Sequence, residues 1–271
     1  TRTRRQRQMC IRDRYIVLGL SLNLNSDFNQ ELSAYSLEEL DEFEDEVINI
    51  YEATKDDELL ISLAKVNFFK ASNYLELYKK SKDQLDLVLA IDYMEDAIDL
   101  DPNQQFYSIF LGDLYYLIKD KDAFYIDAII AYESAGNLLL TEKESVLRLM
   151  EIYITDQQHL NAFTLCSRLM RYDAQWTLQN LMDIYISTAI LSGSTEYSLE
   201  ILEEIIKNTD QNLAELYLTK AYLHSTQATQ KNKLMAESAL ENFFIHSKVS
   251  QDSNPLMQKK AEELKEFLSE S

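Results

Sequence analysis

Small and bulky apolar residues return along this chain in a pattern whose period is about 36 residues. In each copy, a small residue is followed four positions later by a bulky apolar residue and three positions after that by a third packing residue. The clear copies are Ala90/Met94/Ala97, Ala128/Tyr132/Ala135, Ala162/Cys166/Leu169 and Ala236/Leu240/Phe243, and a weaker copy is Ser198/Leu202/Ile205. Spacings of three and four place these side chains on one helix face, and a period in this range indicates a stack of helical hairpins.

The apolar spacing predicts five hairpins followed by one more helix. The predicted helix pairs are 58–81 with 84–100, 104–118 with 122–138, 142–155 with 158–172, 175–191 with 195–208, and 212–226 with 231–247. Asp101-Pro102 ends the first pair, because proline cannot continue the helical hydrogen-bond ladder. Ser253-Asn254-Pro255 predicts the start of a final helix over 255–269, within a segment 251–271. Its apolar residues share one face, as a capping helix requires.

Residues 36–55 predict a separate acidic helix. Ser36 and Glu39 form a Ser-x-x-Glu capping box, and apolar residues from Leu37 to Tyr51 follow at helical spacing. The opposite face carries Asp and Glu side chains. Two interpretations are open: a solvated face, or a surface that attracts a basic partner.

Composition favours an all-α fold, because only four glycines and two prolines occur in 271 residues, too few for the tight turns of a strand-rich fold. The formal net charge of −20 repels phosphate backbones and anionic membrane surfaces, which disfavours nucleic acid as a partner. We also find no apolar run that approaches the roughly 20 residues needed to span a bilayer.

The first fourteen residues, 1–14, are unlike the rest of the chain. They carry six arginines, and the run from Gln8 to Arg14 resembles the translation of a sequencing-library adaptor, so we interpret the segment as a non-native scar. A basic arm for nucleic acid or anionic lipid is the rival interpretation. Without these residues, Lys and Arg fall from 26 to 20, Asp and Glu from 46 to 45, and the net charge from −20 to −25. No methionine lies between Met9 and Met94, so we expect the natural chain to begin upstream.

Residues 15–35 predict a linker or the remnant of a signal segment. Tyr15 to Leu22 is apolar and the chain then turns polar, which is typical of the end of a secretory signal. The alternative is the end of an earlier helix. We favour the signal, and with it the cell envelope or periplasm over the cytoplasm, although the compartment stays open.

We call the first helix of each predicted hairpin the leading helix and the second the trailing helix. Each leading helix carries a tyrosine ahead of the small-residue motif: Tyr78, Tyr115, Tyr153, Tyr185 and Tyr222. Leu111-Gly112-x2-Tyr115, followed by Ala128, Tyr132 and Ala135, resembles the tetratricopeptide repeat, and Pro102 stands where that family's repeat-closing proline belongs. The resemblance covers roughly residues 58–247, within a repeat region 56–250. It implies an all-α, right-handed α-α superhelix of about five hairpins, a solenoid with a C-terminal capping helix.

The resemblance also implies a binding groove. In this family the leading helices line a concave surface, and the residue two positions before the tyrosine points into it. Those positions hold Glu76, Asp113, Glu151, Asp183 and Lys220, and the positions after the tyrosine hold Tyr116, Ile154, Ile186 and Leu223. Trp176 also has a register that faces the groove. The alternative is that a chain with 46 acidic residues carries carboxylates there by chance.

Residues able to carry chemistry are sparse and scattered. His159, His224 and His246 lie in different hairpins without metal-ligand spacing, and no glycine-rich phosphate loop occurs. Cys166 fills the aromatic position of its repeat, so we predict a packing role. The sequence predicts no metal, no cofactor and no catalytic residue.

Three functional hypotheses follow. The first is a non-enzymatic scaffold whose acidic groove binds a segment of another protein, with a preference for basic segments. The second is a structural accessory subunit of a cell-envelope assembly, of a periplasmic or lipoprotein type. The third, an all-α enzyme, has no cluster of titratable residues in the sequence to support it.

Overall fold

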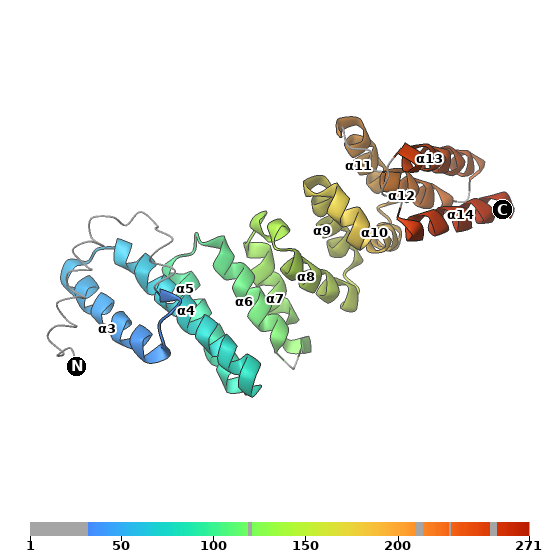
Figure 1. Ribbon diagram of the computed structural model, residues 1–271. Coiled ribbons are helices and arrows are strands. Elements are labelled where there is room, and N and C mark those ends of the chain that lie inside the picture. The colour runs from blue at the N-terminus through green and yellow to red at the C-terminus, as the bar shows by residue number, and fades with distance from the viewer. Residues whose placement is uncertain (1–31, 119–120, 210–213, 228, 250–253, 271) are drawn as a thin grey trace. The chain divides into compact units, whose positions relative to one another are not determined.

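The chain is described by a computed structural model over residues 32–118, 121–209, 214–227, 229–249 and 254–270 (Figure 1). Within these ranges the chain forms helices and no strands. The segment 1–14 and most of the segment 15–35 lie outside the described residues. The chain divides into two compact units, Thr1–Gly136 and Asn137–Ser271.

Unit 1, Thr1–Gly136, is built from helices joined by short turns. They are α3 (Leu37–Thr54), α4 (Glu58–Ser81), α5 (Gln84–Leu100), α6 (Gln105–Leu117) and α7 (Lys121–Ser134). Helix α4 packs on α5 and α6 packs on α7, as two hairpins, while α5 also contacts α6 and α3 lies against α4 (Figure 1). The turn between α4 and α5 uses Lys82 in the left-handed conformation, followed by Asp83, whose side chain accepts a hydrogen bond from the Leu85 amide at 3.0 Å.

Unit 2, Asn137–Ser271, continues the same plan. It contains the 3₁₀ helix η1 (Leu138–Thr141) and α8 (Lys143–Thr155), α9 (His159–Tyr172), α10 (Ala174–Leu191), α11 (Thr195–Asn208), α12 (Ala214–Ser225), α13 (Gln230–Val249) and α14 (Pro255–Glu270). Hairpin partners α8/α9, α10/α11 and α12/α13 pack together, and α9 packs still more extensively on α10, the first helix of the next pair. Alternate helices also touch, α9 with α11 and α10 with α12. The predicted stack of helical hairpins is therefore confirmed within each unit.

The repeated motif forms the core, as its spacing predicted. Ala90, Met94 and Ala97 are fully buried, and the copies that begin at Ala128 and Ala162 are also completely buried. A small residue lets two helix backbones approach, and the bulky residue one turn on fills the space between them. In the weaker copy, Ser198 and Leu202 are buried, whereas Ile205 is only half-buried.

Both predicted helix starts are confirmed by their hydrogen bonds. The Ser36 hydroxyl accepts from the Glu39 amide at 3.3 Å while the Glu39 carboxylate accepts from the Ser36 amide at 2.9 Å, which completes the capping box. At the other end of the chain, the Asn254 side chain accepts from the Leu256 amide at 3.0 Å, and Pro255 is the first residue of α14.

One predicted helix is too long. The range 122–138 is replaced by α7, which ends at Ser134, and by the separate 3₁₀ helix η1. Gly136 lies between them with φ of +59°, a left-handed conformation that ends helices and that glycine adopts without steric cost. Leu139 and Leu140 of η1 then turn into the core of unit 2, where both are buried.

Candidate partner-binding surface

The residues expected to line a groove occupy one position on successive leading helices. The tyrosines that define the register are buried at Tyr78, Tyr153 and Tyr185 and half-buried at Tyr115 and Tyr222. A residue two positions earlier lies about 200° away around the helix, so it points away from the tyrosine's packing face. Glu76, Glu151 and Asp183 are accordingly exposed, and Asp113 and Lys220 are half-buried.

In unit 1, both candidate carboxylates already have partners within the chain. Glu76 forms an ion pair of 2.7 Å with Lys79 on the same helix, and the hydrogen bond and charge of Lys79 lower the pKa of Glu76. Asp113 accepts a hydrogen bond of 2.6 Å from the Tyr132 hydroxyl on α7. Asp113 therefore helps to hold the α6–α7 hairpin together. Tyr116, the apolar candidate of the same helix, is half-buried.

In unit 2, Glu151 on α8 is exposed, and Ile154, less than one turn further along, is exposed to 38%. Ile186 on α10 is half-buried.

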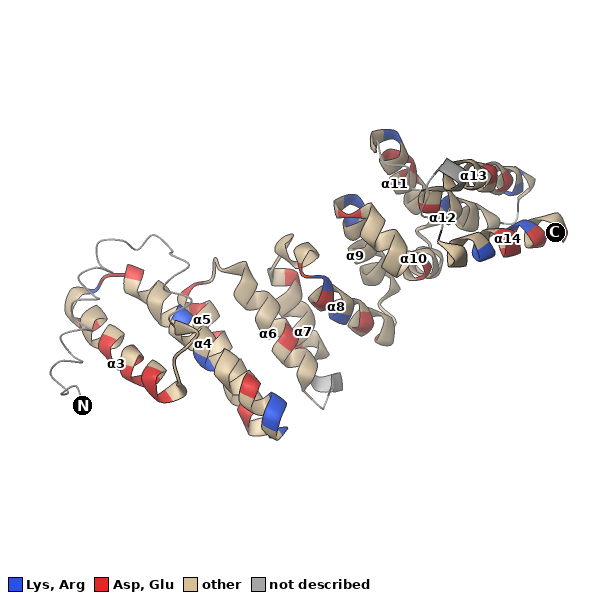
Figure 2. Cartoon of the chain, in the orientation of Figure 1, with Lys and Arg blue, Asp and Glu red and all other residues tan. Residues whose placement is uncertain are grey.

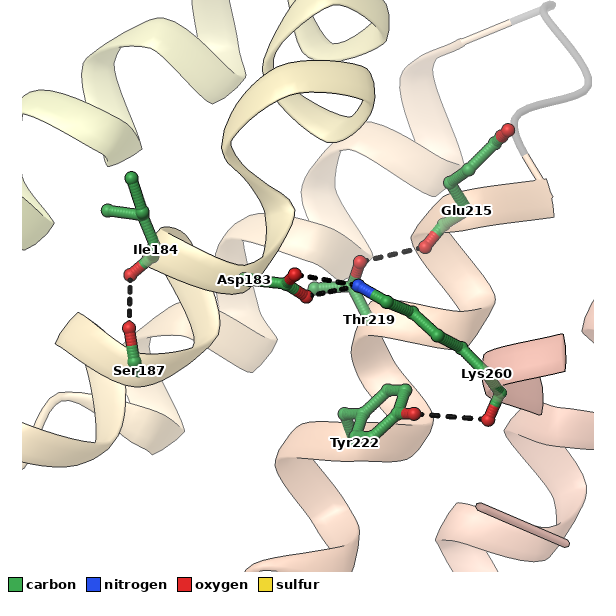
Figure 3. A network of polar contacts seen from close by, with 7 residues as sticks. All are labelled: Asp183, Ile184, Ser187, Glu215, Thr219, Tyr222 and Lys260. Atoms are coloured by element: carbon green, nitrogen blue, oxygen red, sulfur yellow. Dashed lines mark hydrogen bonds and ion pairs between the residues drawn. The ribbon is translucent and has the colours of Figure 1, made fainter. Parts of the chain in front are cut away.

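Asp183 and Lys220, also in unit 2, form ion pairs with neighbouring helices. The Lys260 Nζ atom on α14 lies 2.6 Å and 2.7 Å from the two carboxylate oxygens of Asp183 (Figure 3). Lys220 on α12 contacts Glu203 on α11 at 2.9 Å, and the hydrogen bond and charge of Lys220 lower the pKa of Glu203. The Asp183–Lys260 contact joins residues 77 positions apart, a separation at which helical spacing carries no information.

Of two further residues that were expected at the groove, one lies in the core. Leu223 is fully buried on α12 and belongs to the core, so its predicted place on the surface is wrong. Trp176 is half-buried, and its ring is covered by the Lys143 Nζ atom, 4.4 Å from the ring centre. Lys143 also forms an ion pair of 3.1 Å with Asp173. Trp176 therefore has a cationic partner within unit 2.

The acidic helix α3 carries a row of carboxylates (Figure 2). Two of them, Asp41 and Glu44, contact Lys70 of α4, with 2.6 Å between Lys70 Nζ and the Asp41 oxygen. The Lys70 side chain is only 2% exposed. Burial acts to lower the pKa of Lys70, but the hydrogen bonds and charges of the two carboxylates outweigh burial and raise it. Part of the acidic run thus attaches α3 to α4 within unit 1.

Reactive side chains in the described residues are placed for packing. Cys166 is fully buried, and burial raises the pKa of its thiol to about 12, so a reactive thiolate is disfavoured at neutral pH. His246 stacks on Tyr217 at 4.7 Å between ring centres. Among the residues that the structure describes, no group of three or more His, Cys, Asp or Glu side chains could hold a metal ion. No described helix is long and apolar enough to cross a membrane.

Sequence reasoning did not identify a polar cleft in unit 2, at the turn between α9 and α10. Its volume is about 590 Å³, and its lining includes Arg171, Tyr172 and Glu204. Arg171 Nη2 lies 3.3 Å from a Glu204 oxygen, and both side chains are exposed. The cleft is made from helix ends of two successive hairpins, and no residue pattern along the chain marked it.

No family model matches this chain, and no curated protein matches it. Among solved structures, the chain is similar to the MamA protein, with 17% sequence identity, 74% of this chain and 94% of that chain covered, and a TM-score of 0.36. It is also similar to a tetratricopeptide repeat protein from Parabacteroides merdae, with 12% identity, coverage of 83% and 77%, and a TM-score of 0.31. Similarity at this level carries no argument about function, so the fold rests on the hairpin packing of the chain itself.

Proposed function

We propose that this protein is a non-enzymatic scaffold that binds a segment of another protein along its leading helices. One observation carries the proposal: exposed carboxylates lie two residues before the leading-helix tyrosines, at Glu76 within unit 1 and, on two successive leading helices within unit 2, at Glu151 and Asp183. A surface of this kind favours a segment that bears Lys or Arg. Ile154, exposed beside Glu151, adds apolar contact.

Charge supports a basic segment of protein over the other classes of partner. The net charge of −20 disfavours nucleic acid and anionic lipid, whereas it accelerates encounter with a basic polypeptide. Exposed carboxylates are well solvated, so each one contributes little to affinity on its own. The partner would gain specificity from the row of carboxylates and most of its affinity from apolar contact between them.

A peptide array probed with the full chain tests this function. Glu151→Lys should weaken the binding of basic peptides severalfold, and Glu76→Lys should act in the same direction. The matched controls are Glu200→Lys and Asp96→Lys, which reverse exposed carboxylates on the trailing helices α11 and α5. An array on which basic peptides do not bind, or on which the controls lose as much binding as the leading-helix variants, would refute the proposal.

A further inference from the structure

The C-terminal helix α14 contacts a carboxylate that the proposed function assigns to a partner. Lys260 holds Asp183 of α10 through both carboxylate oxygens, at 2.6 Å and 2.7 Å (Figure 3). The Tyr222 hydroxyl on α12 donates a hydrogen bond of 3.0 Å to the backbone carbonyl of the same lysine. Asp183 is one of the candidate surface carboxylates, and Tyr222 is the register tyrosine of α12, so α14 contacts the candidate surface through Asp183 and the leading helix α12 through Tyr222.

Helix α14 docks with a narrow apolar face. Its buried residues are Met257, Ala261, Leu264 and Leu268, at successive spacings of four, three and four, and the helix packs against α12 and α13. This spacing places one stripe of side chains along the helix. Lys260 lies three residues after Met257, and its side chain is 21% exposed. The pattern is that of an amphipathic helix held in a groove by its apolar stripe and oriented by one lysine.

The seam between α14 and α13 is incompletely filled. A groove of about 290 Å³ lies there, lined on one side by Leu240 and Phe244 of α13 and on the other by Lys265 and Leu268 of α14. Close-packed interiors leave few spaces larger than a water molecule, because each gap loses dispersion contacts. The C-terminal half of α14 therefore leaves part of its seam with α13 unfilled, although Leu264 and Leu268 are themselves buried.

We propose that the surface under α14 also accepts an amphipathic helix of a partner protein, which displaces α14. The partner helix would carry apolar residues at positions i, i+4, i+7 and i+11 and a lysine at i+3, as α14 does from Met257 onward. This inference rests on the proposed function and adds a helical, lysine-bearing partner to it. Because α14 is tethered, its effective concentration is about millimolar, and a partner must outcompete it.

The experiment uses the full chain and a labelled synthetic peptide of residues 255–270 as the probe. In the wild-type chain, the tethered α14 should exclude the peptide. Leu264→Ala in the chain removes a buried contact of α14, so the peptide should bind this variant at least about tenfold more tightly than the wild type. Adding Asp183→Asn to that variant should lower peptide affinity about two- to fivefold, the range of a partly exposed ion pair.

Lys260→Ala in the chain is the second variant, because it weakens α14 without opening a cavity in the core. It should increase peptide binding about two- to fivefold. Lys259→Ala is its matched control, since Lys259 is 73% exposed. Among the ion pairs of the described residues, Lys259 contacts only Glu263, which lies on α14 itself. This control should leave peptide binding unchanged.

Equal peptide binding to the wild type, Leu264→Ala and Lys260→Ala chains would overturn the proposal, as would binding that is indifferent to Asp183→Asn. The proposed function can fail separately from this inference. If array peptides bind in a Glu151-dependent way while the α14 peptide does not, the scaffold function stands and the inference about α14 falls. If the α14 peptide binds as expected while no array peptide does, the exchangeable docking of α14 stands and the wider binding function falls.

Discussion

A Cβ atom added at Gly112 of α6 would lie 2.6 Å from Cδ1 of the Tyr132 ring on α7, well inside van der Waals contact. The ring cannot easily move away, because Tyr132 is fully buried and its hydroxyl is held by Asp113. Gly112 thus allows a close contact between the two helices of its hairpin.

Gly112→Ala should therefore destabilise unit 1 by about 1–3 kcal/mol, the usual cost of overpacking. An alanine in an unobstructed helix position would instead stabilise by about 0.5–1 kcal/mol, so the sign of the change is diagnostic. Urea unfolding followed by circular dichroism measures it. Tyr132→Leu removes the ring. In that background, Gly112→Ala should therefore lower the free energy of unfolding by less than it does in the wild type. A stabilised Gly112→Ala variant would show that the helices are further apart than described.

His224 on α12 is buried, and its pKa is lowered first by burial and then by the charge of Lys220, which outweigh the opposing effects of Glu196 and Glu203. The folded chain thus binds a proton at this site less readily than the unfolded chain, whose histidine titrates near 6.5. The contribution of neutral His224 to the free energy of unfolding is therefore intact above that pH. It is lost as the pH falls from about 6.5 through the lower pKa of His224 in the folded chain.

The unfolding free energy of the wild type should consequently fall more steeply between pH 7 and about pH 5 than that of His224→Leu. Comparing the two chains cancels the contributions of the many carboxylates and of the other histidines. If the free energy of unfolding changes with pH in the same way for both chains over this range, His224 is solvated or paired enough to titrate normally. Urea titrations at a series of pH values provide the comparison.

At the scale of elements, Lys70 attaches the acidic helix α3 to α4. It lies between Asp41 and Glu44, and its Nζ atom is 5.2 Å from the centre of the Tyr93 ring. Removing a buried cation leaves its partners unpaired, but Asp41 is 63% exposed and can return to water. The cost should thus lie below that of breaking a fully buried pair.

Lys70→Ala is expected to destabilise the docking of α3 by about 1–3 kcal/mol. Hydrogen–deuterium exchange of the α3 amides should rise, while the amides of α6 stay protected. Lys79→Ala, which removes an exposed ion pair on the same helix, should change α3 exchange by far less. If both variants behave alike, Lys70 has no special role in holding α3.

Most helix boundaries were predictable because local signals define them. The ranges 58–81, 84–100 and 195–208 match α4, α5 and α11 in full, and Ser36 and Asn254 cap the helices whose starts they predicted. The end of α7 was missed, because Gly136 lies in an apolar stretch whose helical spacing continues into η1. Here the left-handed conformation of one glycine outweighed the periodicity of the residues around it.

At the scale of the whole molecule, the repeat pattern predicted the hairpins within each unit, but only part of the candidate surface. The leading-helix register placed Glu76, Glu151 and Asp183 at exposed positions, because helical periodicity determines which way a side chain points. Partners distant in sequence were out of reach: nothing in the spacing connects Lys260 with Asp183, or Lys70 with Asp41. Leu223 was assigned to the surface because periodicity alone cannot say how many neighbours cover a helix.

The central claim is that the leading helices bind a basic segment through carboxylates. The salt dependence of that binding tests the claim most directly. The measurement is the affinity of a basic peptide selected on the array, for the full chain, as NaCl rises from about 0.1 M to about 1 M. The Debye length falls from about 10 Å to about 3 Å over this range. Affinity should fall steadily with salt, and Glu151→Lys should flatten the dependence where Glu200→Lys does not. An affinity that is constant across the salt series, or the same slope for both variants, would contradict the account.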